Sequence, residues 1–282
     1  MSYQRKPEWL KIRLPHNELS GEVDRIIEEH RLHTVCSSAL CPNKGECWGR
    51  GTATFLIGGD VCTRSCKFCN VLTGRPKPLD PDEPANIARS VKLLGLKHVV
   101  ITSVDRDDLD DLGATHWAQV IRAIKTENPK TTMETLIPDF HGRNELINKV
   151  IHAAPEIISH NLETVRRLSK AIRSRATYEL SLQVIRQIAA SGIVAKSGIM
   201  LGLGETRDEV LATMDDLLDA GCQVMTIGQY LRPSAANIEV AEYVHPDVFN
   251  EYRRIGEEKG FRFVESAPLV RSSYHAERHV KS

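Results

Sequence analysis

The sequence predicts an α/β protein, a partial (β/α)6 barrel of the TIM type with an extension at each end. Strand-like and helix-like segments alternate from residue 53 onward. One strand-like run, 99–101, is continuously apolar, as in parallel strands that are covered on both faces. Six strand–helix units are fewer than the eight of a closed barrel. We therefore expect an open side that suits a large or protein-bound substrate.

The individual elements follow from apolar runs and helical spacing. Ile87, Val91 and Leu94 recur at the spacing of one helix face. The expected strands cover residues 54–58, 98–103, 132–137, 156–160, 194–200 and 223–229, with a last strand-like run at 261–264. The expected helices cover 84–94, 115–125, 143–153, 164–172, 178–190 and 206–220, with a short one at 21–31. We divide the chain into an N-terminal extension (1–52), the barrel (53–265) and a C-terminal segment (266–282), which together form one structural unit.

Composition limits the function classes. Lys plus Arg and Asp plus Glu both number 37, so the formal net charge is zero and nothing favours nucleic acid or an anionic membrane as a partner. No apolar run approaches the roughly 18 residues of a membrane span, and the N-terminus lacks the apolar core of a signal peptide. Six of the seven cysteines lie between Cys36 and Cys69, unlike a secreted disulfide scaffold. We expect a cytoplasmic protein in which the remaining Cys222 is a small buried hydrophobe.

Three cysteines follow the first barrel strand at spacing C-x3-C-x2-C: Cys62, Cys66 and Cys69. Three thiolates on one loop can hold three irons of a [4Fe–4S] cluster and leave the fourth iron open to a small ligand. Structural zinc is the alternative, but zinc needs four ligands and no second cysteine pair follows. With Phe68 at its aromatic position, the spacing resembles that of the radical S-adenosylmethionine (SAM) superfamily.

A second triplet, Cys36, Cys41 and Cys47, precedes the barrel at spacing C-x4-C-x5-C. Pro42 and Gly45 favour turns that can wrap the three thiolates about one centre. Two alternatives remain: the six thiolates could be pooled around a pair of zinc ions, or they could be inert core thiols. Pooling is less favoured, because each triplet closes locally and six ligands fit tetrahedral sites awkwardly.

Polar side chains follow the expected strands at their C-terminal ends, where barrels of this type carry their chemistry. By position we assign seven residues to a zwitterionic, ribose-bearing ligand such as SAM: Phe68, Ser103, Glu134, Asn161, Glu163, Arg173 and Met200. Asp107, Asp108 and Thr164 are candidate helix caps. Gly202 and Gly204 are candidates for a tight turn.

Motifs along the whole chain resemble those of lipoyl synthase. Besides the two cysteine triplets they are KPEWLK (6–11), VDRDDL (104–109), ETLIPDF (134–140), HNLET (160–164), YLRPS (230–234) and RSSY (271–274). On these motifs the chain is identified as a member of that family. It departs from the family pattern at 235–239, where a more basic stretch ending in proline is expected, and at 165–167 and 172–174, which each lack a proline. These departures concern loops over the barrel mouth and no cluster ligand.

The resemblance implies a radical SAM sulfurtransferase that inserts sulfur at C6 and C8 of a protein-bound N6-octanoyl-lysine. The cluster on Cys62, Cys66 and Cys69 would bind SAM and cleave it to a 5′-deoxyadenosyl radical. An auxiliary cluster on the first triplet would be the sulfur source, with Ser273 as its fourth ligand. Ser273 and Arg271 are accordingly the catalytic assignments, and the cofactors are SAM and two [4Fe–4S] clusters.

The resemblance also implies three kinds of protein partner. They are octanoylated lipoyl carrier domains (the glycine cleavage H protein and E2 subunits of 2-oxoacid dehydrogenases), an electron donor such as ferredoxin or flavodoxin, and an Fe–S carrier that rebuilds the spent cluster. A sulfur-inserting enzyme of the biotin synthase kind would share the triplet at 62, 66 and 69 but not the rest. A non-enzymatic zinc protein is the alternative from a different class.

Overall fold

An eight-stranded sheet forms the centre of the computed structural model, which describes residues 5–11, 33–34 and 43–280. Its strands, in spatial order, are β1 (His33–Thr34), β2 (Thr52–Ile57), β5 (His98–Ser103), β6 (Thr132–Leu136), β7 (Ile157–Ser159), β8 (Val194–Leu201), β9 (Val224–Gln229) and β10 (Phe263–Ser266). All neighbours pair in parallel except β1, which is antiparallel to β2. The sheet order ends at β1 and β10 without pairing between them. The predicted partial barrel is therefore confirmed.

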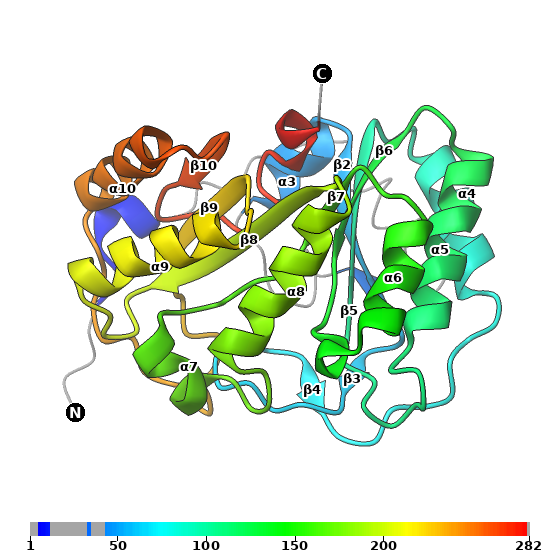
Figure 1. Ribbon diagram of the computed structural model, residues 1–282, viewed down its shortest axis with the longest axis horizontal. Coiled ribbons are helices and arrows are strands. Elements are labelled where there is room, and N and C mark those ends of the chain that lie inside the picture. The colour runs from blue at the N-terminus through cyan, green and yellow to red at the C-terminus, as the bar shows by residue number, and fades with distance from the viewer. Residues whose placement is uncertain (1–4, 12–32, 35–42, 281–282) are drawn as a thin grey trace.

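Helices cover the outer face of the curved sheet (Figure 1). They are α4 (Glu83–Leu93), α5 (Ala114–Glu127), α6 (Asn144–His152), α7 (Arg166–Ile172), α8 (Tyr178–Ala190), α9 (Arg207–Asp219) and α10 (Pro246–Lys259). The hydroxyl oxygens of Thr177 and Thr206 accept from the backbone N–H groups of Leu180 and Glu209 and so cap α8 and α9. These caps begin the helices next to the chemistry-bearing loops.

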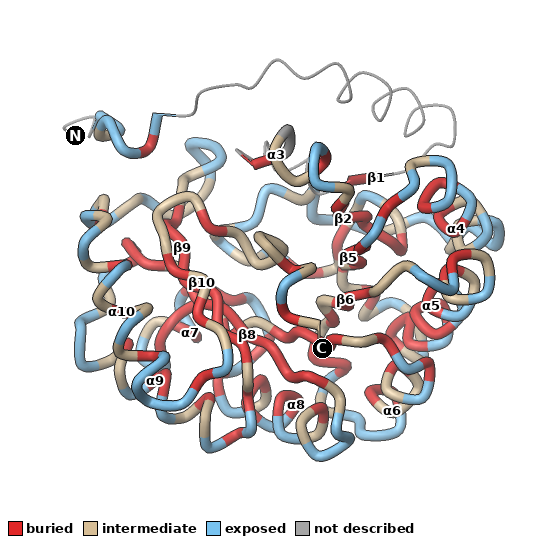
Figure 2. The backbone as a smooth tube through the Cα atoms, turned by 90° about the horizontal axis from the view of Figure 1, so that it is seen from above, coloured by how far each residue is buried: buried red, intermediate tan, exposed pale blue. Residues whose placement is uncertain are grey.

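The strands are buried on both faces because side chains alternate between the helix layer and the barrel interior. Met133, Ile158 and Ala195 belong to the main apolar core. Their neighbours Glu134 and Lys196, with 0% and 1% exposure, therefore face the interior. Figure 2 shows the strands as a ring with the C-terminal end of the chain near its centre. The interior thus holds a buried ion pair next to the small apolar cluster of Ile157, Val194 and Val224.

Two elements on the C-terminal side differ from the sequence prediction. The strand-like run expected at 261–264 is β10, which adds a seventh parallel strand beside β9. The helix α10 precedes it and was not predicted. The start of α10 is marked in the sequence, because Pro246 stands at the first helical position and His245 caps the helix. The expected helix at 21–31 lies outside the described residues.

The two ends of β2 lead to different short elements. Before β2 stands α3 (Lys44–Gly49), and after it come β3 (Val61–Cys62) and β4 (Leu72–Thr73). A six-residue strand is about 20 Å long. Figure 1 accordingly shows α3 at one end of the barrel, beside the C-terminal turn η3 (Ala276–His279), and β3 and β4 at the other. Within the described residues, no helix combines the length and the apolar character needed to cross a membrane.

Candidate active site

The cluster loop, residues 62–69, begins on β3 and is tied to the end of β5. Cys62 pairs with Thr73 of β4, and its carbonyl accepts from Gly74 N–H at 3.0 Å. Thr63 N–H donates to Asp105 O at 3.1 Å, just beyond β5. Within the loop, Cys69 N–H donates to Cys66 O at 3.1 Å. The three cysteines therefore lie on a well-defined loop at the C-terminal ends of the strands.

Backbone N–H groups point at two of the three sulfur atoms. Arg64 N and Asp105 N lie 3.4 and 3.3 Å from Cys62 Sγ, and Val71 N lies 3.5 Å from Cys69 Sγ. Donors of this kind stabilise a thiolate and tune a bound cluster. Burial raises the pKa of Cys62 to about 11, so the thiol keeps its proton until a metal replaces it.

This donor set fits an iron–sulfur cluster. Within the described part of the chain, no three His, Cys, Asp or Glu side chains converge as ligands of one metal ion. A [4Fe–4S] cluster does not need that convergence, because each thiolate binds a different iron. The residues present thus suit a cluster held by Cys62, Cys66 and Cys69.

A buried arginine pins the cluster loop. Arg64, whose side chain is 4% exposed, donates two hydrogen bonds to Asp107 at 2.9 Å and two to Asp139 at 2.8 Å. Burial alone would raise the pKa of Asp139, but its hydrogen bonds from Arg64 outweigh burial and hold that pKa well below the usual range. Paired guanidinium and carboxylate groups with satisfied hydrogen bonds are rigid, so the loop has one geometry.

Three cap assignments from the sequence are wrong. The carboxylate of Asp107 binds Arg64, and that of Asp108 binds Arg106 at 2.9 Å. Asp111 instead accepts from Thr115 N–H at the start of α5. Thr164 is not a cap either, because α7 begins after Val165. The tight turn at Gly202 and Gly204 is confirmed by their positive φ values of 94° and 99°.

Four of the residues predicted to bind SAM are polar and lie around the mouth of the barrel beside the cluster loop. Ser103 Oγ, at the end of β5, is buried and has no hydrogen-bond partner among the described residues. Asn161 hydrogen-bonds Glu163, and Arg173 lies close enough to Glu163 to lower its pKa, although burial outweighs this and raises it. Arg173 also donates to Ser181 Oγ at 2.6 Å. An unpartnered hydroxyl and a buried acid–base pair suit a polar ligand.

The two apolar members of the predicted set meet in one cluster. Phe68 and Met200 pack with Ile172, Leu203 and Tyr230. The cluster loop is joined to α7, which ends at Ile172, because Lys67 N–H donates to Ile172 O at 2.9 Å. The structure thus brings residues from the first and fifth predicted strand units together beside the three cysteines.

Glu134 is placed elsewhere. Its two carboxylate oxygens accept from Ser159 Oγ at 2.5 Å and Lys196 Nζ at 2.8 Å, deep in the barrel interior. Burial acts to raise the pKa of Glu134, but the Lys196 ammonium lowers it below the ordinary value. Since both oxygens are engaged, we do not carry Glu134 forward as a SAM contact.

Sequence reasoning missed one contact to the cluster loop. Asn237 Nδ2 donates to Cys69 O at 2.8 Å and to Lys67 O at 3.2 Å. Asn237 lies in the stretch where the sequence departs from the family pattern. The departure therefore includes a residue that contacts the cluster loop. No pattern at 235–239 signals this contact, because it joins segments 168 residues apart.

The second centre involves α3 and the segment after β10. Cys47 lies on α3 and is partly buried, whereas Cys36 and Cys41 lie outside the described residues. Tyr274 OH donates to Glu46 Oε1 at 3.3 Å, so the residue after Ser273 contacts the residue before Cys47. The two chain segments that contain Cys47 and Ser273 are therefore held together.

Comparison with known proteins agrees with these observations. The family model described as "Radical SAM superfamily" matches residues 56–217. Proteins named "Lipoyl synthase" from Treponema denticola and Parabacteroides distasonis are 67% and 65% identical to this chain. The first alignment covers 99% of this chain and 96% of the relative, and the second covers 98% of each. The chain belongs to the lipoyl synthase family.

Members of this family are radical SAM enzymes that use SAM and two [4Fe–4S] clusters to insert two sulfur atoms into a protein-bound octanoyl-lysine, and this chain is a lipoyl synthase. This membership decides against a biotin synthase and against a non-enzymatic zinc protein. Solved structures support the fold. Methylornithine synthase (PylB) has a TM-score of 0.56 at 12% identity, covering 84% of this chain and 69% of that one. SuiB of Streptococcus suis with its precursor peptide SuiA has a TM-score of 0.61 at 10% identity, covering 88% and 53%.

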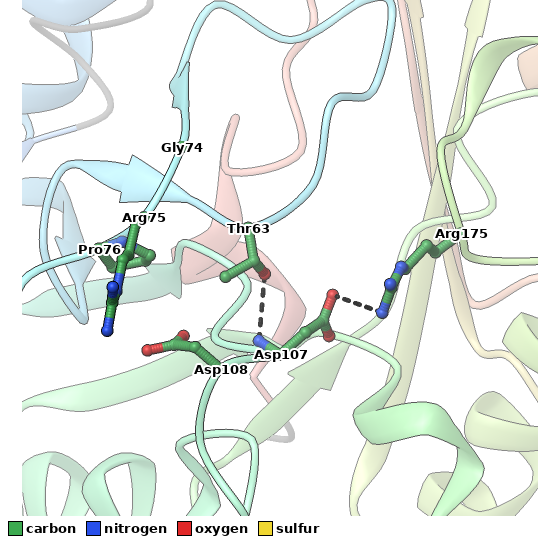
Figure 3. A pocket seen from close by; sticks show the side chains of 7 residues that line it. All are labelled: Thr63, Gly74, Arg75, Pro76, Asp107, Asp108 and Arg175. Carbon is green, nitrogen blue, oxygen red and sulfur yellow. Dashed lines mark hydrogen bonds and ion pairs between the residues drawn. The ribbon is translucent and has the colours of Figure 1, made fainter.

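A cavity of about 430 Å³ opens on the outer side of the cluster loop of this lipoyl synthase (Figure 3). Thr63, Gly74, Arg75, Pro76, Asp107, Asp108 and Arg175 line it. Figure 3 shows Thr63 Oγ1 accepting from Asp107 N–H, and the Asp107 carboxylate facing Arg175 at 3.6 Å. None of the residues predicted to bind SAM lines this cavity. The lining of this cavity and the set assigned to SAM are therefore separate groups of residues.

Proposed function

We propose that the two triplets divide the work of the lipoyl synthase reaction. Cys62, Cys66 and Cys69 hold the cluster that binds SAM. Cys36, Cys41 and Cys47, with Ser273 as fourth ligand, hold the cluster that gives up sulfur. The single observation that carries this division is the contact between Tyr274 and Glu46, which keeps the RSSY motif beside α3 and away from the cluster loop.

The cofactors supply the chemistry that no side chain can, because an unactivated methylene has no acidic proton and must lose a hydrogen atom to a radical. The chain's own residues position and shield the reactants. Arg64 holds the cluster loop rigid. Ser103, Asn161, Glu163 and Arg173 offer polar groups to SAM, and Phe68 with Met200 offers an apolar surface.

Ser273 has a role that cysteine could not fill. A serine oxygen is a hard ligand and matches the iron of a sulfide cluster less well than a soft thiolate does. Its departure would free one iron and expose sulfide to the substrate carbon. Arg271 donates to Val270 O at 2.7 Å and lies 3.5 Å from Gln229 O, so it attaches the motif to the end of β9. We propose that Arg271 orients Ser273.

The test is Ser273→Ala, with the neighbouring Ser272→Ala as matched control. Ser273→Ala should cleave SAM at nearly the wild-type rate and form no lipoyl product from an octanoylated carrier peptide. Ser272→Ala should cleave SAM and also form lipoyl product as the wild type does. Anaerobic counting should give about eight irons per wild-type chain. Unchanged lipoyl formation by Ser273→Ala would refute the role of Ser273.

The partners follow from the reaction. We propose that the substrates are octanoylated H protein and E2 domains, that ferredoxin or flavodoxin donates electrons, and that an Fe–S carrier rebuilds the spent cluster. Reduced thiols and oxygen-sensitive clusters suit the reducing cytoplasm. We also propose that 1–52 and 266–282 act together as the second-cluster unit around the barrel at 53–265.

A further inference from the structure

The segment after β10 crosses the open side of the barrel, between the unpaired ends of the sheet. Gln229 N–H, at the end of β9, donates to Pro268 O at 3.1 Å. Val270 O packs so closely on Gly228 that a Cβ there would lie 2.2 Å from it. The chain then passes Ser273 and Tyr274 and ends in η3, which packs against β5. Residues 268–279, which we term the C-terminal strap, therefore span the opening.

One end of the strap is anchored in the barrel interior. The side chain of His279 is fully buried, and its Nδ1 lies 3.4 Å from Lys196 Nζ. Lys196 Nζ is also 2.8 Å from Glu134 Oε2, and both of those side chains are at most 1% exposed. Because an ammonium only donates, Nδ1 accepts and the proton lies on Nε2. That nitrogen faces Glu265 Oε1 of β10 at 3.6 Å.

The part of the strap just before its buried end contacts α3. Besides Tyr274, His275 Nε2 lies 3.7 Å from Glu46 Oε1, and Arg50 reaches Glu277 at 3.8 Å. The rings of Tyr274 and His275 stack with centroids 3.9 Å apart. These contacts are half-exposed and long, so they are weak by themselves. Of the contacts that follow Ser273, the buried one at His279 is therefore the strongest.

We propose that His279 is a positioning residue for the second cluster. Held between Lys196 and Glu265, it fixes the strap so that Ser273 stays beside α3 and Cys47. This inference rests on the proposed role of Ser273. The pair Lys196–Glu134 keeps its own contact without His279, so the barrel and the cluster loop do not depend on it. Loss of His279 should therefore release the strap and spare the first cluster.

The experiment compares His279→Leu with His279→Gln, purified and reconstituted anaerobically. His279→Leu should hold about four irons per chain instead of about eight, cleave SAM within about twofold of wild type, and form no lipoyl product. Hydrogen exchange should rise in residues 268–279 and remain unchanged in β5 and β6. His279→Gln should restore the second cluster, because its amide can accept from Lys196 and donate to Glu265.

His116→Leu is the matched control. His116 is another buried histidine in contact with a carboxylate, 2.5 Å from Glu83, but it lies in the helix layer. The His116→Leu variant should keep about eight irons per chain. If His279→Leu keeps both clusters, or loses both together, the positioning role is overturned. A wild-type protein with only about four irons would instead overturn the proposed function, and this inference with it.

Discussion

The two metal centres of this lipoyl synthase are built in opposite ways. The proposed ligands of the first centre all lie within 62–69, directly after one strand, and a buried arginine fixes their loop to the neighbouring strand ends. The second centre joins α3 to the C-terminal strap through contacts such as Tyr274 with Glu46, which are 228 residues apart. A locally built site forms with its loop, whereas a site made of distant segments exists only once the sheet has assembled and brought those segments together.

The largest effect is expected from a substitution of one proposed ligand in the cluster loop. Cys66→Ala should abolish SAM cleavage and lower the iron content from about eight to about four per chain. Folding should be little affected, because Cys66 is partly exposed and its sulfur makes only a long contact, 3.6 Å, with Ser174 Oγ. Iron analysis and 5′-deoxyadenosine formation measure both effects. Cys222→Ala, at a buried cysteine far from both centres, should keep its iron. Retained SAM cleavage by Cys66→Ala would contradict the assignment.

The rigidity of the cluster loop can be tested at Arg64. Arg64→Leu leaves Asp139 as a buried carboxylate without its cation and removes the two hydrogen bonds to Asp107, which should lower the free energy of unfolding by about 3–5 kcal/mol. Arg166→Leu removes an exposed arginine that pairs with Asp216 at 3.1 Å and should cost less than about 1 kcal/mol. Denaturant unfolding of the apoprotein compares the two. Equal losses would show that Arg64 does not pin the loop.

The smallest effect is expected at the junction of strap and α3. Tyr274→Phe removes one hydrogen bond to Glu46, worth about 0.5–1.5 kcal/mol. A chelator should then remove iron from the second cluster up to about tenfold faster and from the first at an unchanged rate. Tyr178→Phe removes a similar bond, to Asp216 at 2.8 Å, in the helix layer, and should change neither rate. Faster loss from both clusters would argue against a local junction.

Much of the fold was predictable because its signals are local. Parallel strands appear as apolar runs and helices as periodic stripes, so β5 was predicted at its observed bounds, 98–103. The helix α10 was missed although Pro246 and His245 mark its start. Cys222 was predicted as a buried hydrophobe and is 3% exposed. Asp107 was misassigned as a cap because its partner, Arg64, comes from another loop. Asp108 was misassigned although its partner, Arg106, stands only two residues earlier.

Sequence alone determined the ligand spacing of the cluster loop, the alternation that makes a barrel, and the motifs that place the chain among lipoyl synthases. These properties depend on residues close together in the chain. The tertiary structure alone decided that Glu134 pairs with Lys196 in the barrel interior, that Asn237 binds the cluster loop, and that His279 reaches the same ion pair. Such contacts join residues far apart in sequence. Their energy comes from burial and from hydrogen bonds that exist only when the strands have brought those residues within reach.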